Sequence, residues 1–130
     1  MIILSIRTEK VDSELALFED SKKIDEIIWE AHRTLSETIH TKIKDLLDRN
    51  SLDWHSIEGI ICYKGPGSFT GLRIGLTVAN SLAYGLKIAV IGQNGNDWQS
   101  IAIKQLLKGE NQKIIIPEYG APVNITRPKK

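Results

Sequence analysis

A glycine-rich loop holds the residues of this chain that could do chemistry. It follows an apolar run, precedes a helical pattern, and reads Lys64-Gly65-Pro66-Gly67-Ser68-Phe69-Thr70-Gly71-Leu72-Arg73-Ile74-Gly75. A tight turn that leads into a helix presents backbone amides, and the positive end of the helix dipole favours anions there. The pattern therefore indicates a candidate anion-binding loop formed by Gly65, Gly67, Ser68 and Thr70.

The spacing of the loop excludes two familiar nucleotide motifs. A Walker A loop needs Lys and then Ser or Thr after its last glycine, whereas Leu72 and Arg73 follow Gly71. The glycines also lack the G-x-G-x-x-G spacing of a dinucleotide fingerprint. Two other interpretations stay open: the glycines permit positive φ angles and close packing, and Ser68 or Thr70 caps the helix.

The sequence contains no complete catalytic constellation. The three histidines, at 32, 40 and 55, lack the H-E-x-x-H spacing of a zinc hydrolase. Ser68 has no identifiable base, and Cys62 lies in an apolar run, which is typical of a buried and inert thiol. We therefore predict no catalytic residue, no metal site and no cofactor.

Apolar periodicity predicts an alternating order of elements. Strands are expected at residues 2–6, 14–19, 23–29, 57–63, 87–91 and 113–116, and helices at 34–50, 70–84 and 97–107. The short links between the first three strands predict an antiparallel meander. Such an order is that of a single ribonuclease H-like α/β domain with a mixed sheet, as in actin-like ATPase folds. We assign residues 1–116 to this domain, with strand 113–116 beside 2–6 or 87–91, and residues 117–130 to an irregular Pro-rich, basic tail.

The helix at 34–50 has a clear start and one apolar face. Thr34 and Glu37 match the capping box, in which each side chain accepts a hydrogen bond from a free backbone amide. The predicted core-facing stripe spans an arc of about 120° and consists of Leu35, Ile39, Ile43, Leu46 and Leu47.

The helix at 70–84 is apolar over an arc of about 200°, roughly twice what one sheet face requires. Gly71, Gly75 and Ala79 repeat at four-residue spacing and form a ridge of small residues. Such ridges let a second helix approach closely, and exposed apolar surface marks protein interfaces. The helix is therefore either deeply buried in its own domain or in contact with a second surface, and of the two we predict that this ridge contacts a helix of another chain.

Composition describes an ordinary globular domain. The chain has 130 residues, of which 42% are hydrophobic and 25% charged, and its net charge of +1 demands no polyanionic partner. A single cysteine fits a reducing compartment. We find neither a secretion signal nor an apolar run of about 20 residues, so we expect a cytoplasmic protein with no membrane contact.

The glycine loop and its helix, continuing through Ala79 and residues 82–86, resemble the signature segment of the TsaB (YeaZ) family. The resemblance extends over most of residues 1–91, and residues 117–120 are similar to the family's last segment.

Two departures from the family's pattern stand out. Family members are usually longer, with a second lobe that is mostly missing here. Their first strand usually ends in Asp-Thr, whereas this chain has Arg7-Thr8, and a cation there would repel magnesium.

The resemblance implies a non-catalytic accessory subunit rather than an enzyme. It would bind a TsaD-like catalytic subunit and, with a TsaE-like ATPase, support the N6-threonylcarbamoylation of tRNA adenosine 37. Alone it would form a homodimer, and it would meet tRNA only through the complex. Both contacts would use helices 34–50 and 70–84, and the implied interface comprises Ile39, His40, Ile43, Thr70, Gly71, Arg73, Ile74, Gly75, Val78, Ala79 and Leu82.

Two alternatives remain open at this stage. One is a small phosphate- or nucleotide-binding enzyme that uses the loop from Gly65 to Thr70. The other is a tRNA-binding accessory module, because Arg127, Lys129 and Lys130 lie on the Pro-rich tail.

Overall fold

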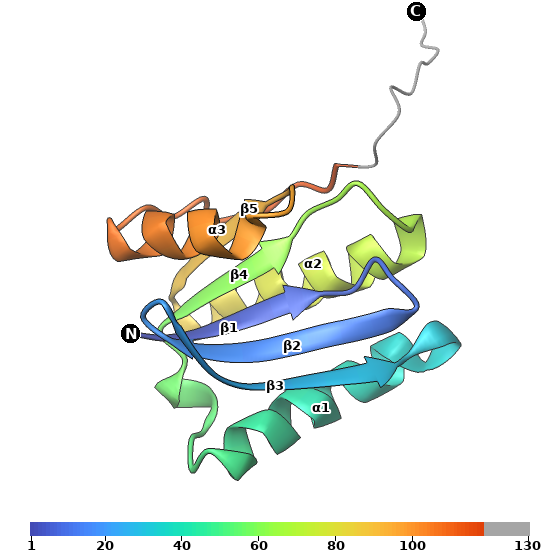
Figure 1. Cartoon of the computed structure of the whole chain (residues 1–130), viewed down its shortest axis with the longest axis horizontal. Helices are drawn as coiled ribbons and strands as arrows, with labels where there is room; N and C mark the ends of the chain where they lie inside the picture. The colour runs from blue at the N-terminus through green and yellow to red at the C-terminus, as the bar shows by residue number, and fades with distance from the viewer. Residues whose placement is uncertain (119–130) are drawn as a thin grey trace, which may run out of the picture.

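The computed structural model describes residues 1–118 except for the side chain of His32, so most of the predicted tail, from residue 119 onward, lies outside the described residues. The elements appear in the predicted order, apart from a last strand (Figure 1). The strands are β1 (Ile2–Arg7), β2 (Asp12–Glu19), β3 (Lys22–Glu30), β4 (Gly59–Tyr63) and β5 (Ala89–Gln93). The helices are α1 (Leu35–Arg49), α2 (Phe69–Leu86) and α3 (Trp98–Leu107), with short 3-10 helices at His32–Thr34 and Trp54–Ser56.

The sheet is mixed, and its strand order is β3-β2-β1-β4-β5. The first three strands pair antiparallel, as the short links predict, with Leu4 opposite Leu17 and Leu15 opposite Ile27. On its other side β1 pairs parallel with β4, which pairs parallel with β5. The carboxyl ends of these three parallel strands therefore lie at one edge of the sheet, the usual position of ligand sites in open α/β sheets.

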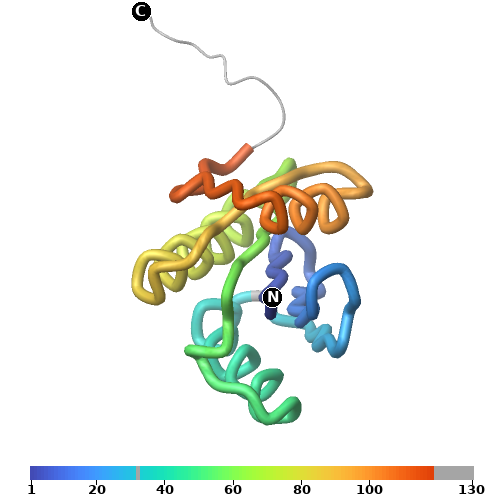
Figure 2. Tube along the Cα trace, turned by 90° about the vertical axis from the view of Figure 1, so that its left-hand side faces the viewer, coloured from blue at the N-terminus to red at the C-terminus, as the bar shows by residue number. Residues whose placement is uncertain are grey.

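Helices cover both faces of the sheet (Figures 1 and 2). Helices α1 and α2 lie on one face, where all five residues of the predicted α1 stripe are buried in the main core. Helix α3 lies on the other face and packs Trp98 and Leu106 against Ile61 and Ile91 in a second core. Burial of apolar area in these two layers is the main stabilising contribution to such a fold.

The start of α1 is correctly predicted, but the capping mechanism is not. Thr34 occupies the N-cap position without accepting a hydrogen bond on its side chain. Its hydroxyl donates instead to the Ala31 carbonyl at 2.6 Å. A 3-10 turn at His32–Thr34 precedes the helix and places that carbonyl within reach, so the local hydrogen bond replaces the capping box.

The predicted strand at 113–116 is wrong, because the segment pairs with no strand. One backbone hydrogen bond, from the Gln112 amide to the Val90 carbonyl at 3.0 Å, and two side chains hold the preceding residues beside the sheet edge instead. Asn111 and Gln112 accept hydrogen bonds from the β5 amides of Val90 and Gly92 at 3.1 and 2.9 Å. Ile115 then inserts into the main core. Since side-chain oxygens occupy these β5 amides, the backbone of the segment cannot add as a sixth strand there.

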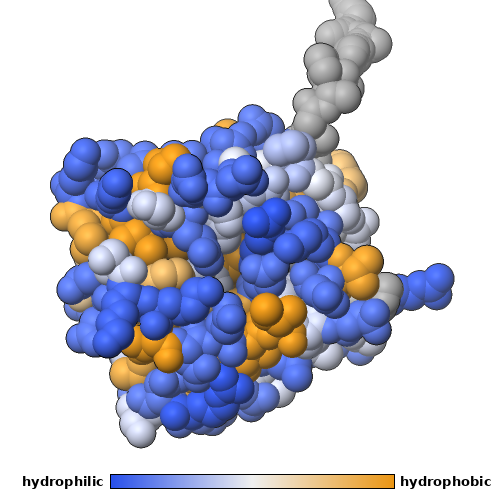
Figure 3. Space-filling model, viewed as in Figure 1, coloured by the Kyte–Doolittle hydropathy of each residue, from blue (hydrophilic) through white to orange (hydrophobic). Residues whose placement is uncertain are grey.

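Part of the α3 side of the sheet is open to solvent. Helix α3 does not extend over β3, and Ile28 on this side of β3 is 55% exposed. Figure 3 views this side and shows apolar residues in separate small patches among hydrophilic ones. Within residues 1–118, no helix is both long and apolar enough to cross a membrane.

Candidate functional site

The small-residue ridge of α2 faces its own chain, so its predicted contact with another chain is wrong. A Cβ atom on Gly71 would lie 2.2 Å from the Thr8 carbonyl oxygen, and one on Gly75 would lie 2.1 Å from Thr8 Oγ1. Ala79 is fully buried in the main core. The glycines are needed because the end of β1 crosses α2 at this point, and Thr8 Oγ1 donates to the Gly71 carbonyl at 2.6 Å. The close approach inferred from the ridge is real, but its partner is a loop rather than a helix.

A groove between α1 and α2 carries the accessible part of the predicted interface. Its volume is about 430 Å³, and it is lined by Ser36, Ile39, His40, Thr70, Arg73, Ile74, Thr77 and Val78. The side chains of His40, Thr70 and Arg73 are exposed, whereas Ile39 and Val78 form a buried apolar floor. This combination of an apolar floor and a polar rim is typical of protein-binding surfaces. We refer to these eight residues as the α1–α2 groove.

The remaining predicted interface residues lie elsewhere. Ile43 lies on the buried face of α1, and Leu82 packs against the main core, so neither lines the groove. Two groove residues were missed, Ser36 and Thr77. Helical spacing could have identified both, because Ser36 lies four residues before His40, and Thr77 lies four residues after Arg73.

The glycine loop is shaped by close contacts within the chain. Gly65 has φ +118°, and a Cβ there would collide with the Glu118 carbonyl oxygen. A Cβ on Gly67 would lie 2.2 Å from Glu9 Cγ. Ser68 is the N-cap residue of α2, yet its side chain makes no capping hydrogen bond. The structural roles of Gly65 and Gly67 therefore account for these glycines without a ligand.

Beside the loop, a second cavity opens at the carboxyl end of β1, between the starts of α1 and α2. Its volume is about 380 Å³. Thr70 and Ile74 line this cavity and the α1–α2 groove alike. We call it the strand-end pocket; its wall includes Lys10, Ser13, Arg33, Ser68, Thr70 and Gly71.

Arg7 is held by an ion pair at the end of β1. Its guanidinium donates to both carboxylate oxygens of Glu9, at 2.7 to 3.1 Å, and lies 4.2 Å from the centre of the Tyr63 ring. Burial disfavours the charged form of Arg7, but the hydrogen bonds and the charge of Glu9 outweigh it and raise the pKa. A permanently charged cation therefore occupies the position where an acidic residue was expected from the resemblance.

The thiol of Cys62 is fully enclosed. It lies in β4, and burial raises its pKa well above the usual range. Because the thiolate is the reactive form, this thiol is not suited to nucleophilic chemistry in the folded protein.

Comparison with known proteins identifies the family. The family model described as TsaD, tRNA N6-adenosine threonylcarbamoyltransferase, matches residues 29–110, which include α1, α2 and the glycine loop. The chain belongs to the TsaD/TsaB family. The Bacillus subtilis tRNA threonylcarbamoyladenosine biosynthesis protein TsaB is 33% identical over 90 residues, which are 69% of this chain and 39% of that protein. The Geotalea daltonii tRNA N6-adenosine threonylcarbamoyltransferase is 40% identical over 73 residues, which are 56% of this chain and 21% of that protein.

A solved TsaD/TsaB-family structure has the same fold. YeaZ from Pseudomonas aeruginosa superposes with a TM-score of 0.66 at 25% identity, over 72% of this chain and 43% of that one. The predicted ribonuclease H-like fold and the resemblance to TsaB are thus confirmed. This chain spans less than half the length of these three relatives.

Proposed function

We propose that this protein is a TsaB-like accessory subunit, which binds a TsaD-like catalytic subunit through the α1–α2 groove. It thereby supports threonylcarbamoyladenosine formation on tRNA. The observation that carries the proposal is the groove itself, an unfilled surface with an apolar floor and the exposed side chains of His40 and Arg73 at its rim. It lies wholly within the segment that matches the family model.

An accessory role agrees with the charges at the carboxyl end of β1. In a metal–nucleotide enzyme, the end of this strand would supply a carboxylate ligand for a hard cation. Here Arg7 stands at that position, and the nearby carboxylate of Glu9 is paired with Arg7 and only 6% exposed. The proposal therefore assigns catalysis to the TsaD-like partner, with a TsaE-like ATPase as a further member of the complex and tRNA held only by the assembly. In the absence of these partners, the same groove would join two copies of this chain.

The proposal is tested by reconstitution. The full chain, a TsaD-like protein and a TsaE-like protein from the same organism would be combined with ATP, threonine, bicarbonate, unmodified tRNA and the enzyme that makes the threonylcarbamoyl donor. We expect modification only when this chain is present, and none from this chain without the TsaD-like protein. Equal modification in its absence would contradict the proposal.

The discriminating control is turnover by the isolated chain. ATP hydrolysis that persists through purification and is lost in Thr70→Ala would favour the alternative of a small phosphate-handling enzyme. Modification activity that requires the chain but survives Arg73→Glu would leave the accessory role intact and exclude the groove as the binding surface.

A further inference from the structure

The strand-end pocket contains a buried hydroxyl with no partner. Ser13 Oγ is fully enclosed and is the one side-chain polar atom, among those the structure describes as buried, that forms no hydrogen bond. It lines the pocket at the start of β2. A buried polar group without a hydrogen bond lowers stability, and such groups are rare in folded proteins. A ligand in the pocket would supply the missing partner.

The start of α2 adds free donors to the same cavity. The first amides of an α-helix have no acceptor within the helix, and the side chain of Ser68 does not cap this one. Thr70 and Gly71, in the first turn, line the pocket. Amide hydrogens and the positive end of the helix dipole there favour a negatively charged group.

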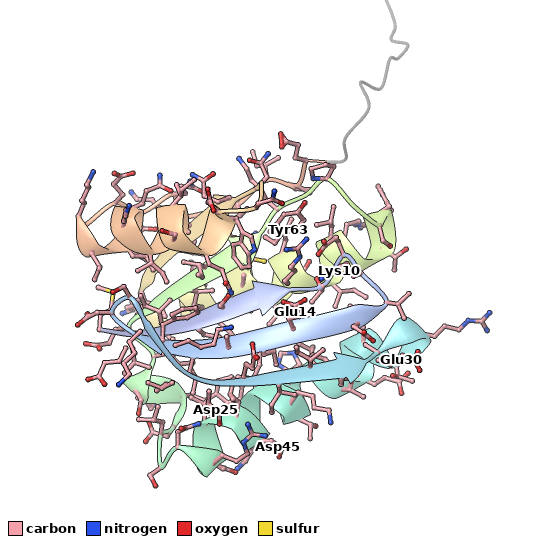
Figure 4. All side chains as sticks on the ribbon, in the orientation of Figure 1. Lys10, Glu14, Asp25, Glu30, Asp45 and Tyr63 are labelled. Atoms are coloured by element: carbon pink, nitrogen blue, oxygen red, sulfur yellow. The ribbon has the colours of Figure 1, made fainter. Side chains whose placement is uncertain are left out.

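The side chains around the pocket leave one positive charge unbalanced. Glu9 is neutralised by Arg7, and Lys10 is neutralised by Glu14 at 2.7 Å. Figure 4 shows Lys10 and Glu14 at this end of the sheet. Arg33 is exposed at the pocket and forms no ion pair with any side chain in the described part of the chain. A planar guanidinium suits the two oxygens of a carboxylate or a phosphate.

The rest of the wall is apolar. Val11, Ala31, Leu35 and Ile74 contribute its apolar side chains. The volume of about 380 Å³ lies at the lower end of the range of small-molecule sites, about 300–1,000 Å³. This size and lining suit a small molecule with an oxyanion at one end and an apolar portion at the other.

We propose that the strand-end pocket binds the oxyanion of a small metabolite, either a carboxylate or a phosphate. Arg33 and the amides of Thr70 and Gly71 hold its oxygens, and the Ser13 hydroxyl donates to one of them. The apolar part of the ligand packs against Leu35 and Ile74. Thr70 and Ile74 line both this pocket and the α1–α2 groove, but the proposal does not depend on the accessory function, because it concerns ligand binding by the chain alone.

The test is a pair of titrations of the full chain, followed by amide shifts in two-dimensional NMR. Sodium phosphate is one probe and sodium acetate the other, each at constant ionic strength maintained with sodium chloride. We expect saturable shifts at the amides of Ser13, Thr70 and Gly71. Saturation by phosphate alone identifies a phosphate site, by acetate alone a carboxylate site, and by both a general oxyanion site.

Two arginines provide matched variants, because both are exposed and one lines each cavity. Arg33→Ala should weaken binding about tenfold or more, the effect of losing one charge-assisted hydrogen bond, whereas Arg73→Ala should bind as the wild type does. Ser13→Ala should raise the melting temperature without ligand and yet weaken binding, a combination that a purely structural hydroxyl would not give. The proposal is overturned if neither probe saturates, if the shifts lie elsewhere, or if the two arginine variants weaken binding equally.

Discussion

Thr8 lies directly over Gly75: a Cβ atom added to Gly75 would come within 2.1 Å of Thr8 Oγ1 and 3.2 Å of Thr8 Cβ. The end of β1 therefore rests on the glycine face of α2, and the Thr8 hydroxyl fixes it by a hydrogen bond to the Gly71 carbonyl. This contact joins the loop at the strand-end pocket to the helix that forms one wall of the α1–α2 groove.

The first prediction concerns that contact. Gly75→Ala should lower the free energy of unfolding by about 1–3 kcal/mol, the usual cost of overpacking a well-packed interior. The loss arises in the monomer and should be measured by urea denaturation of the isolated chain.

Gly85 provides the matched control in the same helix, because a Cβ there would meet nothing within 4 Å. Gly85→Ala should instead stabilise by about 0.5–1 kcal/mol through the better helix propensity of alanine. In a Thr8→Ala background, the cost of Gly75→Ala should shrink. If Gly75→Ala were neutral or stabilising, the packing of β1 on α2 would be wrong.

A second prediction follows from the ion pair between β3 and the end of α1. Arg49 donates to Asp25 at 2.6 and 3.2 Å, and Asn50 donates at 2.9 Å, so the pKa of Asp25 is lowered in the folded protein. A lowered folded pKa contributes stability above the unfolded pKa, about 3.9 for an aspartate. That contribution is lost as the pH falls through the lower folded value.

The measurement is the melting temperature of Asp25→Asn and the wild type as a function of pH. The variant should melt lower near neutral pH, and the difference should disappear in acid, below the folded pKa of Asp25. Asp45→Asn is the control, because Asp45 is an exposed carboxylate on the neighbouring part of α1 (Figure 4). A difference between Asp25→Asn and the wild type that persists unchanged in strong acid would show that the ion pair is not its cause.

A third prediction concerns the segment beside β5. The side-chain amide of Asn80 donates to the Ile115 carbonyl at 3.1 Å and accepts from the Ile115 amide at 2.9 Å. Asn80→Ala should lower the free energy of unfolding by about 1–3 kcal/mol, since it leaves two backbone groups without partners. Trypsin should also cleave faster after Lys113.

Asn80→Asp is the paired variant, because it keeps the acceptor and loses the donor. Its effect on cleavage should lie between those of the wild type and Asn80→Ala. Identical cleavage rates for all three proteins would mean that Asn80 does not hold the segment.

Patterns local to one element were predicted well from the sequence. The five buried residues of α1 follow from helical spacing, and the meander follows from the short links at residues 8–11 and 20–21. Contacts between distant segments were not predictable in this way. The wide apolar arc of α2 correctly indicated a close approach at Gly75, but no local pattern identifies Thr8 as its partner. Likewise, Ser13 reads as an ordinary residue near a turn, and only the tertiary structure shows its hydroxyl buried without a hydrogen bond.

The same limit explains the error at residues 113–116. The three consecutive isoleucines from Ile114 to Ile116 have the composition of a strand. In the structure only the middle one is buried, and the outer two are 68% and 75% exposed. The preceding side chains of Asn111 and Gln112 bind the β5 amides, an arrangement that hydrophobicity patterns do not detect.

The central claim is that the α1–α2 groove binds a TsaD-like subunit, and the most direct test is the dissociation constant of that complex by isothermal titration calorimetry. Arg73→Glu reverses a charge in the groove, and Lys104→Glu makes a comparable reversal on α3, across the sheet. We expect Arg73→Glu to raise the dissociation constant at least about tenfold, as for a residue central to an interface, and Lys104→Glu to leave it unchanged. Wild-type affinity for folded Arg73→Glu, or an equal loss in both variants, would contradict the account.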